Sequence, residues 1–188
     1  MFEIVNDLDL SLLVAIQSTR NAFLNAVMST VSFLGNGGLI FIVLVAVLLI
    51  LPKTRRCGVY TAAALVLDAL LCNVILKPLI ARPRPFDFYD VFLRSDILIA
   101  LPNDFSFPSG HTAAAFAFST AIFCENKKCG AAAYAFSVLM GYSRLYLTVH
   151  YPSDVFVGAV LGIACGAAAV LICKAVYKKR SDKLTNMR

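Results

Sequence analysis

Hydrophobic positions along this chain gather in runs about as long as a bilayer is thick, with polar residues between them. Three runs are almost wholly apolar: 33–51, 58–76 and 155–173. A membrane-spanning helix needs about 20 such residues, so each run predicts one span. Two further runs, 109–124 and 129–147, have shorter apolar centres rich in Ala, Gly and Ser, a composition typical of helices packed inside a membrane bundle. We count them as spans, which gives five in all.

The N-terminal segment 8–34 shows a different pattern, because polar residues recur among its apolar positions. These residues are Gln17, Arg20, Asn21 and Asn25. Such mixing favours an amphipathic helix that lies in the membrane interface, although a sixth span remains an alternative. The predicted fold is therefore all-α: a polytopic membrane helical bundle of five spans with an N-terminal interfacial helix.

Composition places the whole chain in a membrane. Hydrophobic residues make up 60% of its 188 residues and the mean hydropathy is +0.79, far above the values of a soluble domain. Linkers rich in Pro, Gly or Ser, internal repeats and low-complexity tracts are all absent from the sequence, so we predict a single domain over residues 1–188. The first residues lack the basic stretch and cleavage site of a signal peptide, and we expect the start of the chain to be retained.

Charged residues separate onto the two sides of the predicted bundle. One side has only the acids Glu125 and Asp182, and its bases are Lys53, Arg55, Arg56, Lys127, Lys128, Lys174, Lys178, Lys179, Arg180, Lys183 and Arg188. The other side carries Glu3, Asp7, Asp9, Asp87, Asp90, Asp96, Asp104 and Asp154, with Arg20, Lys77, Arg82, Arg84, Arg94 and Arg144. Because cytoplasmic loops are rich in Lys and Arg, we predict a plasma-membrane protein with a cytoplasmic C-terminal tail and an outward-facing N-terminus and loop after residue 76.

The basic cytoplasmic side also accounts for the net charge of +6. Anionic lipid headgroups are its expected counter-charge, and nucleic acid is not needed as a partner. The six cysteines avoid the outward, oxidising side: four lie at cytoplasmic ends and two within spans, namely Cys57, Cys124, Cys129, Cys173, Cys72 and Cys165. We therefore expect packing roles for them, without disulfides or a zinc site.

The first segment with candidate chemistry gathers three basic residues at the outward end of the second run. These are Lys77, Arg82 and Arg84, and prolines fix the backbone around them. Basic residues at helix ends also snorkel or offset the helix dipole, which is the alternative reading. Since positive charge is otherwise sparse on the outward side, the segment indicates an anion-binding site.

The second segment runs from Pro108 to His111 and opens the run at 109–124. A proline and a glycine at a helix start leave backbone N–H groups free, and the positive end of the helix dipole favours an anion there. Ser109 is also an ordinary helix-capping residue, which would account for the serine without chemistry. His111 is one of only two histidines, and both lie where a predicted span meets water.

The third segment holds the other histidine. His150 and Asp154 are four residues apart, so a helical turn that includes both lets the carboxylate hold one ring nitrogen and aim the other outward. Steps of four from Asp154 reach three glycines, Gly158, Gly162 and Gly166. This ridge of small residues predicts close helix packing, so the His–Asp pair should face into the bundle.

In order and spacing, the three segments resemble the signature of the type-2 phosphatidic acid phosphatase family. The matching positions are Lys77, Arg84 and Pro85, then Pro108 to His111, then Ser143, Arg144, His150 and Asp154. Three ordered matches between residues 77 and 154 are specific, whereas each alone is weak. The family also contains soluble haloperoxidases, which the composition of this chain excludes.

The resemblance implies a phosphatase that works through a phosphohistidine. His150 would be the nucleophile, Asp154 would stabilise its ring, and His111 would act as general acid and then as base. The phosphate would be held by Lys77, Arg84, Ser109, Gly110 and Arg144. Neither a metal nor another cofactor is expected.

The substrate is expected to be a lipid phosphate or diphosphate. A site at membrane level, beside the aromatic loop residues Phe86, Phe88, Tyr89 and Phe92, suits a phosphate whose tail stays in lipid. Within the family the chain most resembles bacterial undecaprenyl-diphosphate phosphatases, and this resemblance implies conversion of undecaprenyl diphosphate to undecaprenyl phosphate in cell wall biogenesis. Phosphatidylglycerol-phosphate or phosphatidic acid phosphatases are the alternative, and no obligate protein partner is expected.

A transporter is the alternative from another functional class, because basic residues also line transport pathways. A permeation path needs polar residues through the bilayer, and Asp68 is almost the only one here. A charge at that depth costs roughly 2.5–3.5 kcal/mol. We therefore expect Asp68 to make a structural polar contact and leave it outside the site.

Overall fold

The computed structural model describes residues 2–89, 92 and 97–186, and helices are the regular elements of this part of the chain. They are α1 (Phe2–Gln17), α2 (Ala22–Leu34), η1 (Asn36–Gly38), α3 (Leu39–Ile50), α4 (Arg55–Asp68), η2 (Ala69–Leu76), α5 (Lys77–Ile80), α6 (Pro85–Phe88), α7 (Gly110–Glu125), α8 (Lys127–Tyr146) and α9 (Pro152–Thr185). Of the predicted charge map, Asp90, Arg94, Asp96, Arg188 and the side chain of Glu3 lie outside the described residues. The predicted all-α class is confirmed.

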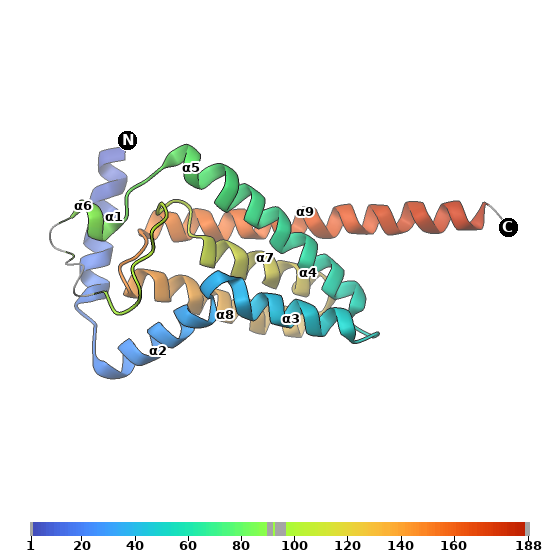
Figure 1. Ribbon diagram of the computed structural model, residues 1–188, viewed down its shortest axis with the longest axis horizontal. Helices are drawn as coiled ribbons and strands as arrows, with labels where there is room; N and C mark the ends of the chain where they lie inside the picture. Colours follow the sequence, from blue (N-terminus) through green and yellow to red (C-terminus); the bar gives the residue numbers. More distant parts are fainter. Residues whose placement is uncertain (1, 90–91, 93–96, 187–188) are drawn as a thin grey trace.

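Helix α7 lies at the centre of the bundle and packs against α9, α8, α4 and α3. These helices run roughly along the long axis of the molecule, α1 crosses them at one end, and α9 extends beyond the other end (Figure 1). Every residue of α7 from Ala117 to Ile122 is buried, which the small and apolar residues of this run permit. The centre of the molecule is thus a helix enclosed by other helices.

The glycines of α9 allow this close packing, as their spacing predicts. A Cβ on Gly158 would lie 2.8 Å from the Ser109 carbonyl oxygen, and one on Gly166 would lie 2.7 Å from the Ala117 carbonyl oxygen. A real Cβ does not approach an oxygen so closely, so the α9 backbone sits where only glycine fits against α7. This contact brings the starts of α7 and α9 together.

Two helical stretches are long and apolar enough to cross a bilayer, Arg55–Phe88 and Pro152–Thr185. Helix α2 and the stretch Asn36–Ile50 pass the same test together, although they are bent by 47° at their junction. The chain is thus an integral membrane protein. All five predicted runs contain helices, and their number as spans stays a prediction.

The N-terminal segment 8–34 forms two helices rather than the single helix we predicted. The break falls at residues 18–21, where the Asn21 side chain accepts a hydrogen bond of 2.9 Å from the Leu24 amide and starts α2. Arg20 donates to the Tyr146 carbonyl oxygen over 2.8 Å, which ties the break to the end of α8. Polar residues that suggested an amphipathic face thus serve a helix cap and a tertiary contact.

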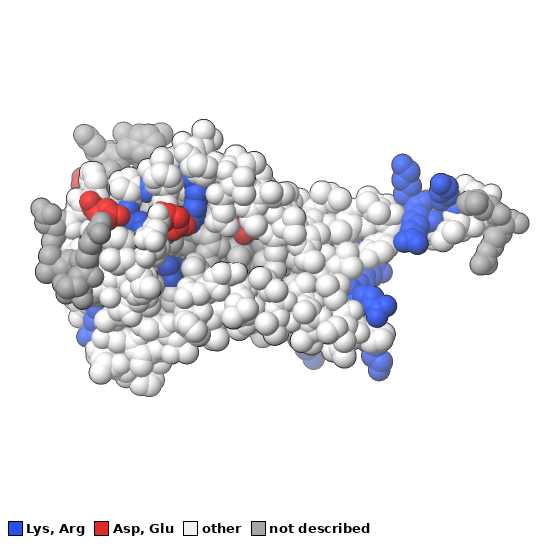
Figure 2. Space-filling view, in the orientation of Figure 1, with Lys and Arg blue, Asp and Glu red and all other residues white. Residues whose placement is uncertain are grey.

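All six cysteines are free. Lys and Arg side chains cluster at the end of the molecule where α9 terminates, while the acidic side chains visible in Figure 2 lie toward the opposite end. The charge separation read from the sequence therefore exists in three dimensions across the described residues.

Candidate active site

The three predicted segments meet at the end of the bundle where α7 and α9 begin. Lys77, Arg84, Ser109, Arg144, His150 and Asp154 are all buried there, and Gly110 and His111 are partly exposed. Segments far apart in the sequence contribute them: the end of the α4–η2–α5 stretch, the loop 81–109, the start of α7, the end of α8 and the turn 147–151. The structure therefore brings the eight predicted residues to one region.

His150 lies in the turn between α8 and α9, with its two ring nitrogens facing opposite charges. Its Nδ1 is 3.5 Å from Asp154 Oδ2, an ion-pair distance without the geometry of a hydrogen bond. Its Nε2 is 3.4 Å from Arg84 Nη1. Burial lowers the pKa of His150 well below 6.5, and the charges of Arg84 and Arg144 lower it further. The ring is therefore neutral, as a nitrogen nucleophile must be.

A helix cap, rather than a shared helical turn, places Asp154 beside His150. Helix α9 begins at Pro152, so the helical turn does not extend to His150 and the two residues are not paired through a shared turn. Asp154 instead closes a capping box, its Oδ2 accepting a hydrogen bond of 3.0 Å from the Tyr151 amide. The same oxygen accepts from the Ser106 hydroxyl, and Oδ1 accepts from Arg82 Nη1 over 2.7 Å.

Lys77 and Arg84 converge on a single carboxylate. The Lys77 ammonium group is paired with Asp104 Oδ2, and Arg84 Nη2 lies 2.5 Å from Asp104 Oδ1. Arg84 is fixed further by a hydrogen bond of 2.5 Å from Nη1 to the Val149 carbonyl oxygen. Burial raises the pKa of Asp104, but the hydrogen bonds and charges of Lys77 and Arg84 outweigh it and lower that pKa to about 2. Two predicted phosphate ligands thus already hold an anion.

Arg144 is buried near this group with part of its guanidinium unused. Its Nη1 donates to the Ser32 hydroxyl, whereas Nε has no hydrogen-bond partner among the described residues. A buried donor of this kind normally finds a partner. Arg144 can therefore offer a hydrogen bond to an anionic ligand.

Ser109 and Gly110 begin α7 against α9. The Ser109 amide donates to the Asp154 carbonyl oxygen over 3.1 Å, and its hydroxyl lies 3.0 Å from Thr112 Oγ1. The hydroxyl makes no capping bond to a helix amide, so the ordinary capping role that the sequence left open is not what the structure shows. A Cβ on Gly110 would lie 2.8 Å from Asn73 Oδ1, so the Asn73 side chain would have to move to make room for it.

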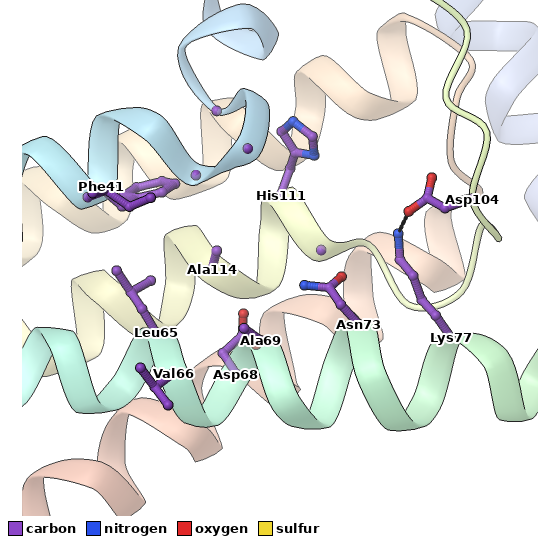
Figure 3. A pocket seen from close by; sticks show the side chains of 15 residues that line it. Phe41, Leu65, Val66, Asp68, Ala69, Asn73, Lys77, Asp104, His111 and Ala114 are labelled. Atoms are coloured by element: carbon purple, nitrogen blue, oxygen red, sulfur yellow. Dashed lines mark hydrogen bonds and ion pairs between the residues drawn. The ribbon is translucent and has the colours of Figure 1, made fainter.

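His111 lies on the wall of an open cavity of about 370 Å³. Figure 3 shows its ring on one side and Lys77, paired with Asp104, on another, with α4 and η2 forming the floor. The His111 Nε2 is 3.2 Å from Asn36 Oδ1. Since Asp104 contacts both Lys77 and Arg84, its carboxylate marks a position between this cavity and the buried Nε2 of His150.

Asp68 lines the same cavity, although the sequence suggested only a structural contact. Its side chain is 1% exposed, and Oδ1 has no hydrogen-bond partner among the described residues. The expected polar contact is therefore not found in this part of the chain. Asn73, five residues further along the same helical stretch, also lines this cavity.

The four aromatic residues that the sequence places beside the site differ in their exposure. Phe86 and Phe92 are buried in a hydrophobic cluster with Tyr151, whereas Phe88 is 61% exposed. Tyr89 is partly buried and packs against the same cluster, with its ring centroid 6.4 Å from that of Tyr151. Three of the four aromatic residues therefore anchor the loop on the turn that carries His150. Three further polar residues belong to the site but are not among the predicted ones: Arg82, Asp104 and Ser106. Of these, Arg82 could have been found from the sequence, because it lies in the basic segment.

Comparison with known proteins is consistent with this geometry. Residues 57–178 match the family model described as the PAP2 superfamily. The chain is 34% identical over 125 residues to the undecaprenyl-diphosphatase BcrC of Bacillus subtilis, covering 66% of this chain and 63% of that protein. It is 27% identical over 175 residues to a lipid A 4'-phosphatase of Bacteroides thetaiotaomicron, covering 86% of this chain and 75% of that protein. It spans only 63% and 58% of the first two curated relatives.

Solved structures show the same fold. The crystal structure of Aquifex aeolicus LpxE matches with a TM-score of 0.73 at 32% identity, covering 87% of this chain and 94% of that one. A PAP2-type phosphatidylglycerolphosphate phosphatase from Bacillus subtilis matches with a TM-score of 0.70 at 29% identity, covering 94% and 87%. Both alignments extend well beyond the motif segments.

Proposed function

The chain belongs to the PAP2 superfamily, and on this premise we propose that it is a metal-independent membrane lipid phosphatase that works through a phosphohistidine. The observation that carries the proposal is the Asp104 carboxylate, bound by Lys77 and Arg84 beside the neutral ring of His150. An anion cradle next to an unprotonated nucleophile is what phosphoryl transfer requires. The phosphate of the substrate would take the place of this carboxylate.

In the first step, Lys77, Arg84 and Arg144 bind the phosphate oxygens and His150 Nε2 attacks phosphorus. An N–P bond forms while the bond from phosphorus to the leaving oxygen breaks. The carboxylate of Asp154, near Nδ1, stabilises the positive charge that develops on the ring. The cations and the start of α7, with Ser109 and Gly110, stabilise the added negative charge of the transition state.

His111 handles the protons on the cavity side. The negative charge of the bound phosphate offsets the nearby cations and favours the imidazolium form of His111. This form protonates the leaving oxygen, and the resulting neutral ring then takes a proton from water. The water oxygen attacks phosphorus, the N–P bond breaks, and phosphate leaves with His150 restored. The charges that a metal would otherwise supply come from Lys77, Arg84 and Arg144.

For the substrate, we propose undecaprenyl diphosphate, which is converted to undecaprenyl phosphate at the outer face of the membrane. The similarity to two undecaprenyl-diphosphatases and the open cavity at the end of the bundle away from the basic tail support this choice. Phosphatidylglycerol phosphate is the second candidate, because the solved relative with that activity aligns with 94% of this chain. Residues 1–188 would act as one phosphatase domain with five spans.

Phosphate release from purified protein in detergent tests both parts of the proposal. We expect turnover of at least one of undecaprenyl diphosphate, phosphatidylglycerol phosphate and phosphatidic acid, undiminished by excess EDTA. Ranking the three by kcat/KM identifies the substrate. Activity that EDTA abolishes and Mg²⁺ restores would contradict metal independence, and absence of phosphate release from all three would contradict the proposed activity.

A further inference from the structure

Helix α1 is connected to the Asp154 carboxylate through one arginine. Arg82 Nη1 lies 2.7 Å from Asp154 Oδ1, and Arg82 Nη2 lies 2.8 Å from Asp9 Oδ2. Both carboxylates are buried, with exposed fractions of 0% for Asp154 and 3% for Asp9. Since burying a carboxylate is costly unless it is paired, the guanidinium between them satisfies two groups that neither helix could bury alone.

Asp9 also holds the first turn of α9 directly. Its Oδ1 accepts a hydrogen bond of 2.9 Å from the Ser153 amide, and its Oδ2 accepts one of 2.5 Å from the Ser153 hydroxyl. Arg82 donates to the same hydroxyl over 2.7 Å and stacks on the Tyr151 ring, 3.7 Å from its centroid. Tyr151 and Ser153, which follow His150 in the chain, are thus held in place by Asp9 of α1 and by Arg82.

These contacts determine how Asp154 is presented to His150. One carboxylate oxygen is bound to Arg82, and the other accepts from Ser106 and from the Tyr151 amide, so the plane of the carboxylate cannot turn. Oδ2 then faces His150 Nδ1 at 3.5 Å. A carboxylate released from Arg82 could rotate away from the ring or shift towards its protonated form.

We propose that Arg82 and Asp9 are positioning residues for the nucleophile: Asp9 holds Arg82, Arg82 holds Asp154, and Asp154 orients His150. The inference rests on the proposed function. It assigns to helix α1 a part in catalysis, although α1 lies outside the residues 57–178 that match the family. The path runs through the buried carboxylates of Asp9 and Asp154 and the partly buried guanidinium of Arg82 between them.

The test measures the single-turnover rate of phosphohistidine formation from phosphate-radiolabelled substrate. Arg82→Gln should slow it about 10- to 100-fold, the usual loss when an outer partner of a functional side chain is removed, with KM nearly unchanged. Asp9→Asn should slow it less. The amide oxygen of Asp9→Asn can still accept from the Ser153 amide, so this variant mainly weakens the contact with Arg82. The double variant should therefore be no slower than Arg82→Gln alone.

Arg20→Gln is the matched control. Arg20 also fastens the N-terminal helices to the rest of the chain, through the Tyr146 carbonyl oxygen at the end of α8. It should lower thermal stability as the other variants do while leaving the labelling rate unchanged. If Arg82→Gln does not fold, Arg82→Lys replaces it, since a lysine keeps the charge but cannot bridge both carboxylates in the same way, and an intermediate rate is expected.

Three results would overturn the proposal. They are an unchanged labelling rate in Arg82→Gln or Arg82→Lys, multiplicative losses in the double variant, and an equal loss in Arg20→Gln. If the parent protein labels normally in those cases, the proposed function still stands. If the parent itself forms no phosphohistidine, the proposed mechanism fails, and the positioning role fails with it.

Discussion

At the scale of single residues, the two histidines occupy different environments. His150 is 1% exposed, between Asp154 and Arg84, whereas His111 lies on the wall of the open cavity. A buried, neutral ring beside cations is suited to attack phosphorus, and a ring at the cavity can meet the leaving oxygen and then water. The two roles inferred from the resemblance thus correspond to two distinct places.

Replacing each histidine should separate these roles. His150→Ala removes the nucleophile, so phosphohistidine labelling and turnover should vanish. His111→Ala removes only proton transfer, which is worth roughly 10²–10⁴ in rate, and the loss should shrink with a nitrophenyl phosphate because its leaving oxygen needs no proton. Initial rates on both substrates and acid-labile labelling measure this. Labelling that survives in His150→Ala would show that the nucleophile is wrongly assigned.

Asp104 should compete with the substrate for the cradle. Asp104→Asn leaves Lys77 and Arg84 without their anion, so inhibition by vanadate should strengthen about tenfold, which corresponds to ~1.4 kcal/mol. The stabilisation from the Asp104 ion pairs is fully present above the ordinary pKa of 3.8 and is lost as the pH falls through the lowered pKa of about 2. The gain should therefore be the same from about pH 5 to about pH 8.

The control for this variant is Asp87→Asn, which removes the same charge from the same loop. Its vanadate inhibition constant should stay near the parent value. Equal strengthening in both variants would mean that the loop acts through its overall charge, and that Asp104 does not occupy the phosphate position.

At the scale of elements, the contact between α7 and α9 positions the site, because it brings Ser109 to Asp154 and sets the two helix starts side by side. The glycines of α9 make this contact possible. At Gly162 a Cβ would overlap the Ala113 carbonyl oxygen and lie 2.9 Å from the Ala117 amide nitrogen. Any larger residue there must push the two helices apart.

Gly162→Val should therefore destabilise the fold and reduce activity together. Overpacking of this kind typically costs about 1–3 kcal/mol. Ala164→Val, two residues along on an exposed part of the same helix, adds similar bulk where there is room and should be close to neutral. Thermal unfolding in one detergent, with phosphate release measured in parallel, compares them. Equal effects of the two substitutions would show that bulk on α9, rather than the contact with α7, is responsible.

At the scale of the whole molecule, the site and the basic tail lie at opposite ends of the bundle (Figures 1 and 2). The tail of α9 carries Lys178, Lys179 and Arg180, and the loop over the site carries Asp104. Membrane proteins keep their Lys- and Arg-rich ends in the cytoplasm. This asymmetry motivates the proposed outward orientation of the site.

Labelling of intact cells with an impermeant thiol reagent tests the orientation. In a background without native cysteines, a cysteine at Leu101 in the exposed loop should react, whereas one at Lys179 in the tail should react only after the cells are permeabilised. Reaction at 179 and protection at 101 would reverse the assigned topology. Cys129, exposed at the start of α8 and restored alone in the same background, provides a second position expected to be protected.

The sequence by itself determined the helices and the residues that meet at the site. Run length and hydropathy are local properties, so the predicted runs all contain helices, and the α9 glycines pack as their spacing indicated. Motif residues from Lys77 to Asp154 lie together because each sits at the end of a helix or in the adjoining turn, at the same end of the bundle.

Only the tertiary structure decided which side chains pair across the loop 81–109. Asp104 pairs with Lys77 and Arg84. Arg82 belongs to the same short basic segment, but it points away from these two residues and bridges Asp9 and Asp154. The split of segment 8–34 into two helices also depended on a distant contact, that of Arg20 with the end of α8.

Periodicity and spacing describe neighbours within one element. Pairings of charges between distant segments depend on how those segments fold over one another, and a lone acid such as Asp9 or Asp104 carries no local pattern that identifies its partner.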